Sequence, residues 1–102
     1  MNRFGDRVRE LREQQNLLQR QVAGKLDIDT PMLSKIERGE RRAKREQVIT
    51  FSKILSADQN ELIILWLADR VYEIVKDEDL AKDALKVAEK ECKYAKKPIA
   101  KA

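Results

Sequence analysis

The side chains of this chain that could do chemistry are mainly basic, and the residue type that catalysis most often uses is missing. The 102 residues include no histidine and one cysteine, Cys92. Without histidine, Ser-His-Asp and Cys-His nucleophile arrangements are excluded, and so is the commonest metal ligand. We therefore predict no catalytic residue, no metal site and no cofactor, and we do not expect an enzyme.

Most of the net charge lies in one short segment, Arg-Gly-Glu-Arg-Arg-Ala-Lys-Arg at residues 38–45, which we call the basic segment. Its net charge of +4 equals that of the whole chain. Residues 1–50 hold 12 basic and 8 acidic residues, whereas residues 51–102 hold 10 of each. Clustered cations of this kind neutralise phosphates, although an ordinary solvated loop has the same composition. The secondary structure that precedes the basic segment decides whether it is a phosphate-binding segment or an ordinary solvated loop.

Helices are predicted to position the basic segment. Apolar residues recur at three-and-four spacing, and three glycines and two prolines are too few for a many-stranded β fold. The spacing predicts helices over about 3–15, 19–26, 30–38, 46–55 and 59–76, with a last one after the acidic run at 77–79. The fold class is therefore all-α.

The start of the third helix is the best-defined boundary. Asp29 precedes Thr30 and Pro31, so a carboxylate can accept an orphan backbone N–H where proline loses no bond. Gly39 is expected to end this helix in a left-handed conformation. About three residues then separate the second and third helices, which is the spacing of a helix-turn-helix.

The segment from Asn16 to Arg42, NLLQRQVAGKLDIDTPMLSKIERGERR, resembles the Cro/repressor-type (XRE-like) helix-turn-helix family of DNA-binding transcriptional regulators. Its most specific part is LSKIERGERR, placed about eleven residues after QRQVA, and the resemblance covers about residues 3–66. It implies a five-helix lambda-repressor-like domain followed by an extended C-terminal helical segment. It also implies double-stranded DNA as the partner.

The resemblance implies roles for particular residues. In the family the third helix enters the major groove, so the implied base-contacting residues are Thr30, Pro31, Ser34 and Lys35. The implied phosphate-contacting residues are Gln19, Arg38, Arg41 and Arg42, with Lys44 and Arg45 extending the set. Arg12 and Glu37 match an internal ion pair that orients the reading helix.

Three departures from the family pattern affect these expectations. Leu18 replaces the Ser or Thr that usually caps the second helix, which removes a hydrogen bond worth about 1 kcal/mol. Asp27 stands where glycine is usual, so it must tolerate a left-handed conformation or change the turn. The third helix is poor in the Gln, Asn and Arg that contact bases in pairs of hydrogen bonds. We therefore expect modest sequence discrimination, or reliance on DNA shape.

The helix predicted at 59–76 is apolar on more than one face, although a helix exposed on one side needs only one apolar stripe. The surplus can belong to the core of its own domain or to a subunit interface, and we predict both together. The predicted homodimer interface contains Leu65, Trp66, Val71 and Ile74. The predicted domains are a helix-turn-helix domain at 1–68, a C-terminal helical extension for dimerisation at 69–97 and a disordered tail at 98–102.

These features together predict a sequence-specific transcriptional regulator that binds a palindromic operator as a dimer and represses or activates. A cytoplasmic location is predicted, because Cys92 can form no disulfide within the chain and the apolar run at 62–68 is too short to span a membrane. One alternative is an antitoxin or adaptor whose C-terminal helices bind a partner protein. Another is a controller protein of a restriction–modification system.

Overall fold

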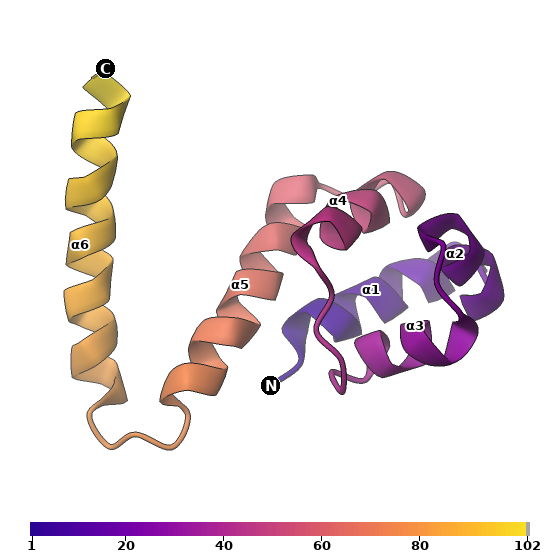
Figure 1. Ribbon diagram of the computed structural model, residues 1–102, viewed down its shortest axis with the longest axis horizontal. Coiled ribbons are helices and arrows are strands. Elements are labelled where there is room, and N and C mark those ends of the chain that lie inside the picture. The colour runs from indigo at the N-terminus through magenta and orange to yellow at the C-terminus, as the bar shows by residue number, and fades with distance from the viewer. Residues whose placement is uncertain (102) are drawn as a thin grey trace. The chain divides into compact units, whose positions relative to one another are not determined.

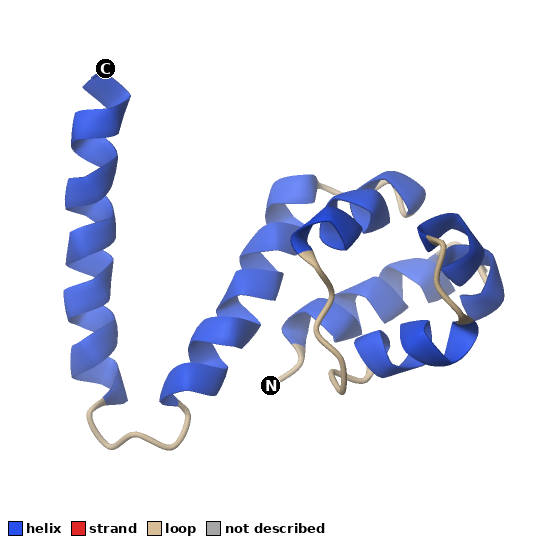
Figure 2. Ribbon diagram, in the orientation of Figure 1, coloured by secondary structure: helices blue, strands red, loops and turns tan. Residues whose placement is uncertain are grey.

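The computed structural model describes the backbone of residues 1–101 and the side chains of residues 1–94. Within these residues it contains six helices and no strand, which confirms the predicted all-α fold (Figure 2). The helices are α1 (Arg3–Gln14), α2 (Gln19–Leu26), α3 (Thr30–Glu37), α4 (Arg45–Ile54), α5 (Gln59–Val75) and α6 (Ala81–Lys101).

The chain divides into two compact units, Met1–Tyr72 and Glu73–Ala102. The boundary between these units lies within the last turn of α5. The tail predicted at 98–102 falls outside the residues whose side chains the structure describes. No helix among the described residues is long and apolar enough to cross a membrane.

The first unit packs helices α1 to α4 and most of α5 around one core (Figure 1). Phe4 of α1 and Phe51 of α4 meet edge to face, with ring centroids 5.7 Å apart. The core takes its residues from the positions that recur at three-and-four spacing. Its buried apolar residues are Phe4, Val8, Leu11, Val22, Ala23, Leu33, Ile36, Ala43, Val48, Phe51, Leu55 and Leu62.

Residues in the left-handed conformation end several of these helices. Gly39 follows α3 with φ 78°, as predicted, and Asn16 follows α1 with φ 56°. Asp27 adopts φ 59° after α2, so it tolerates the conformation that the family pattern assigns to glycine. The next residue, Ile28, then donates its N–H to the carbonyl of Ala23 at 3.1 Å and closes the turn. The short connection to α3 is preserved without glycine.

The start of α2 compensates in part for its missing cap. The side chain of Leu18 makes no capping hydrogen bond. The carboxamide oxygen of Gln21 instead accepts a hydrogen bond from the Leu18 N–H at 2.7 Å, which satisfies a donor just outside the helix.

Candidate nucleic-acid interface

Helix α3 is anchored on one side and open on the other. At its start, Asp29 Oδ1 accepts a hydrogen bond from the Met32 N–H at 2.7 Å, which is the predicted cap. On the inward side, Leu33, Ile36 and Glu37 are buried. The four predicted base-contacting residues lie on the outer side: Pro31 and Lys35 are exposed, and Thr30 and Ser34 are half-buried.

A buried ion pair fixes α3 against α1. Arg12 Nε lies 2.7 Å from Glu37 Oε2, and Arg12 Nη2 lies 3.0 Å from Oε1, so the pair predicted from the resemblance is present. Gln19 Nε2 donates to the same Glu37 Oε1 at 3.0 Å, and Arg12 Nη1 donates to the Leu17 carbonyl at 2.9 Å. The hydrogen bonds that Arg12 donates to Glu37 raise the pKa of Arg12, although burial opposes the shift. Gln19, predicted to contact phosphate, is thus partly engaged inside the domain.

The beginning of α1 packs closely on the end of α3. Asn2 Nδ2 donates to the Glu37 carbonyl at 2.7 Å. A Cβ atom on Gly5 would lie 2.5 Å from that carbonyl oxygen, so only glycine allows this approach. Sequence analysis did not assign these contacts. A glycine inside an otherwise helical pattern is the signal that could have indicated a close approach.

Helix α5 also holds the start of α1, through an aspartate that sequence analysis missed. The two carboxylate oxygens of Asp69 each accept a backbone N–H at 2.9 Å, one from Arg3 and one from Phe4. These are first-turn donors of α1, where Asn2 makes no side-chain capping bond. Asp69 therefore caps α1 from 65 residues away, and no local pattern could have predicted this.

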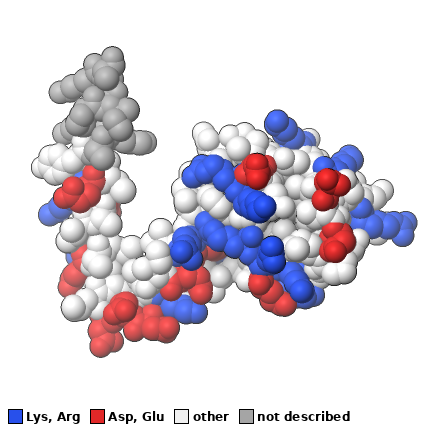
Figure 3. Space-filling model, in the orientation of Figure 1, with Lys and Arg blue, Asp and Glu red and all other residues white. Residues whose placement is uncertain are grey.

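The basic segment crosses the surface between α3 and α4, and Figure 3 shows Lys and Arg side chains gathered over this part of the first unit. The side chains of Arg41 and Lys44 are exposed and make no hydrogen bond or ion pair with other described residues. Arg38, in contrast, forms an ion pair with Glu40 and donates a hydrogen bond to the Ser34 hydroxyl. The cations of the basic segment therefore differ in whether their side chains are already bound within the protein.

Arg42 is bound to Trp66 of α5. Its guanidinium carbon lies 4.0 Å from the centroid of the indole ring, and its Nη1 donates to the Trp66 carbonyl at 3.0 Å. The indole N–H of Trp66 in turn donates to the Ala43 carbonyl at 2.8 Å. Desolvation by burial and the nearby Arg70 lower the pKa of Arg42. Arg45 approaches the same ring at 5.3 Å, so this contact ties the basic segment to α5.

The two apolar faces of α5 have different surroundings. Leu62 is fully buried, and Leu65 and Trp66 pack against the core of their own unit. Val71 and Ile74, the other two residues of the predicted dimer interface, are 43% and 64% exposed. Ile64 and Leu67, which sequence analysis did not assign to the interface, are 62% and 42% exposed. The exposed stripe therefore consists of Ile64, Leu67, Val71 and Ile74, at the three-four-three spacing of a helix-packing seam.

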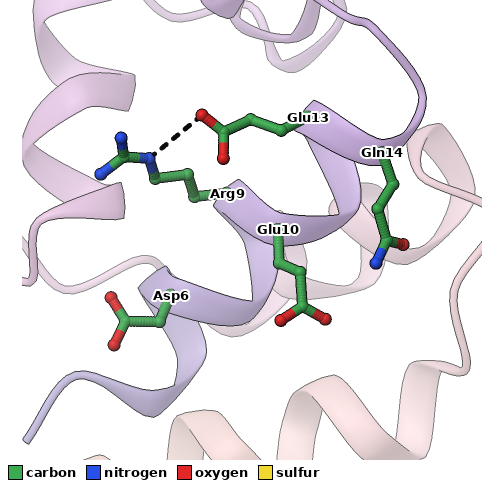
Figure 4. Close-up of a pocket in the computed structure, with 5 residues that line it drawn as sticks. All are labelled: Asp6, Arg9, Glu10, Glu13 and Gln14. Carbon is green, nitrogen blue, oxygen red and sulfur yellow. Dashed lines mark hydrogen bonds and ion pairs between the residues drawn. The ribbon is translucent and has the colours of Figure 1, made fainter.

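The depressions in the surface of the first unit include one under the basic segment and one along α1. A cavity of about 210 Å³ lies under the basic segment, lined by Ile28, Met32, Ile36, Arg41, Arg42, Lys44 and Gln47. A second, shallow one follows the exposed side of α1, where Arg9 pairs with Glu13 at 3.4 Å beside further acidic residues (Figure 4). Among the described residues, no group of three or more His, Cys, Asp or Glu could hold a metal ion.

Residues 3–62 match the family described as helix-turn-helix domain, which is more than half of the chain. The chain belongs to this family of DNA-binding domains. Its match begins with α1 and ends near the start of α5, so it includes α3, the basic segment and the Arg12–Glu37 pair. No curated protein and no solved structure matches the chain.

Proposed function

We propose that the chain is a transcriptional regulator of the Cro/repressor type (XRE-like) that binds double-stranded DNA by inserting α3 into the major groove, with no enzymatic step. The observation that carries this proposal is an anchored α3 whose outer side lies next to the basic segment. Thr30, Pro31, Ser34 and Lys35 then face the base edges. Lys35 can donate to guanine O6 and N7, and the Thr30 methyl can contact a thymine methyl.

Phosphate contacts are proposed for Arg41, Lys44 and Arg45, whose side chains are exposed. Arg42 contributes less than predicted from the resemblance, because Trp66 holds its guanidinium. Each phosphate contact changes the slope of log K against log salt by about −0.9. The affinity of the protein for DNA of any sequence is therefore expected to fall as the salt concentration rises, by about one such step for each contact.

A homodimer on a palindromic operator is proposed, because two reading helices can then meet successive major grooves about 34 Å apart. The exposed stripe on α5, which includes Val71 and Ile74, supports this assembly. The proposed location is the cytoplasm.

The experiment is selection of bound DNA from a random pool with the purified protein, followed by affinity measurements over a range of salt. We expect an enriched palindrome, and we expect Arg41→Ala to weaken binding to all sequences alike while flattening the salt slope by about one contact. Lys53→Ala is the matched control, since Lys53 is an exposed cation in the last turn of α4. An unselected pool, with the same salt slope for both variants, would contradict the proposal.

The second candidate function is an antitoxin or adaptor that binds another protein. The exposed apolar side chains of the second unit, Leu80, Leu85, Val87 and Tyr94, support it. Mass measured in solution with and without DNA separates the two candidates. A dimer that shifts operator DNA favours the regulator, of which a restriction–modification controller would be a subclass. A monomer indifferent to DNA favours the adaptor.

A further inference from the structure

The outer side of α3 lacks a planar guanidinium or carboxamide, the groups whose two hydrogen-bonding atoms are held in a fixed geometry that matches a base edge. Between Thr30 and Glu37 there is no Arg, Asn or Gln. Lys35 can donate to guanine, but its ammonium rotates on a flexible stem, and Pro31 has no side-chain donor. Bidentate pairing is a strong source of discrimination between base pairs in the major groove. The first residue beyond the helix is an arginine, Arg38, which the family resemblance places among the phosphate contacts.

The side chain of Arg38 lies along α3 rather than pointing into the loop. Its Nη1 donates to Ser34 Oγ at 2.7 Å, one helical turn back on the outer side. Glu40 holds it from the other direction, with Arg38 Nε to Glu40 Oε2 at 2.6 Å and Nη2 to Oε1 at 3.3 Å. The guanidinium is thus fixed beside Ser34, which is itself a proposed base contact.

The hydrogen bonds leave a specific set of donors unused. A guanidinium carries five N–H groups. Glu40 takes one on Nε and one on Nη2, and Ser34 takes one on Nη1. One N–H remains on each terminal nitrogen, and guanine O6 and N7 accept such a pair.

The charge of the pair also favours a base over a phosphate. A guanidinium that is already paired with a carboxylate offers little net charge to a phosphate, and Glu40 itself would repel one. A neutral base edge is not repelled in this way, and it needs only the two free donors. Arg38 keeps the pKa of Glu40 below its usual value, so the carboxylate is ionised at neutral pH.

We propose that Arg38 is a specificity-determining residue that reads a guanine at one position of each half-site, and that Ser34 and Glu40 position its guanidinium. This inference rests on the proposed function and names the base that its reading helix recognises. It moves Arg38 from the phosphate contacts to the base contacts.

The test compares Arg38→Lys with Arg41→Lys on the sequence that the wild-type protein selects and on the same sequence with the candidate guanine replaced by adenine. Both variants keep the charge, but only Arg38→Lys removes a fork from the proposed base contact. We expect Arg38→Lys to lower the preference for guanine by about 5- to 150-fold without changing the salt slope. We expect Arg41→Lys to leave the preference unchanged. Glu40→Gln should lower it less than Arg38→Lys, because the guanidinium remains.

Circular dichroism and Trp66 fluorescence check that each variant is folded. An unchanged guanine preference in Arg38→Lys, together with a salt slope flattened by about one contact in Arg38→Ala, would overturn this inference and return Arg38 to the phosphate contacts. That result leaves the proposed function standing, since the wild-type protein still selects DNA. A wild-type protein that selects no sequence would overturn both.

Discussion

Removing one partner of the Arg12–Glu37 pair should destabilise the first unit strongly, whereas removing both should not. The side chains of Arg12 and Glu37 are only 11% and 2% exposed. In Glu37→Leu, the Arg12 guanidinium is left largely buried with one remaining partner, the Leu17 carbonyl. Breaking a buried pair in this way costs about 3–5 kcal/mol.

That cost is large for a unit of this size. Small domains are stable by roughly 0.05–0.15 kcal/mol per residue, so the loss removes a large part of the unfolding free energy of residues 1–72. At about 4–8 °C per kcal/mol, Tm should fall by at least about 12 °C. In Arg12→Leu/Glu37→Leu no buried charge remains, and apolar replacements of buried pairs are often neutral. The double variant should therefore recover most of the loss.

The assay is urea unfolding of the full chain, followed by the fluorescence of Trp66, the single tryptophan, which packs in the first unit. The pKa of Arg12 is raised, so its stabilising contribution is complete below the ordinary arginine value and is lost only far above neutral pH. The cost should therefore be the same at pH values from about 6 to 8. A Glu37→Leu cost below about 1 kcal/mol, or a double variant as unstable as the sum of the singles, would refute the reasoning.

Three further predictions concern the stability of the first unit. Gly5→Ala should cost at least about 1–3 kcal/mol in denaturant unfolding, because its Cβ would overlap a backbone carbonyl of α3, whereas the control Gly24→Ala has open space and should stabilise the helix by about 0.5–1 kcal/mol. Trp66→Phe should lower the free energy of unfolding by about 1–2 kcal/mol, since it removes the indole hydrogen bond to Ala43 and weakens the cation–π contact with Arg42. Unfolding followed by far-UV circular dichroism measures this, and an unchanged free energy would mean that these contacts do not stabilise the unit. Arg38 lowers the pKa of the exposed Glu40, so the stabilisation is complete above the ordinary value of 4.5 and is lost as pH falls through the lowered value. The Tm of Glu40→Gln should therefore lie slightly below that of the wild type at neutral pH, because an exposed ion pair contributes little, and the two Tm values should converge in acid.

The elements were predictable from the sequence because their signals are local. Asp29 with Pro31 defines the start of α3, and Gly39 defines its end, so the helix-turn-helix spacing needs no tertiary information. The core followed from apolar spacing in the same way. Asp69 and Trp66 could not be assigned, because their partners lie 65 and 23 residues away and depend on how α5 packs. Leu65 and Trp66 illustrate the limit: the spacing showed that α5 is apolar on more than one face, but not which face turns inward.

The geometry of the basic segment changes what its charge means for DNA binding. A net charge of +4 at residues 38–45 would suggest that every cation there meets a phosphate. Glu40 instead pairs with Arg38, and Trp66 holds Arg42, so the phosphate contacts that we propose are limited to Arg41, Lys44 and Arg45. Three such contacts per subunit would contribute about −2.7 to the salt slope, less than five contacts would. We therefore expect a modest salt dependence together with a marked preference for guanine. The reason is that the charges of Arg38 and Arg42 are engaged by Glu40 and Trp66 within the protein and are not available to neutralise phosphates.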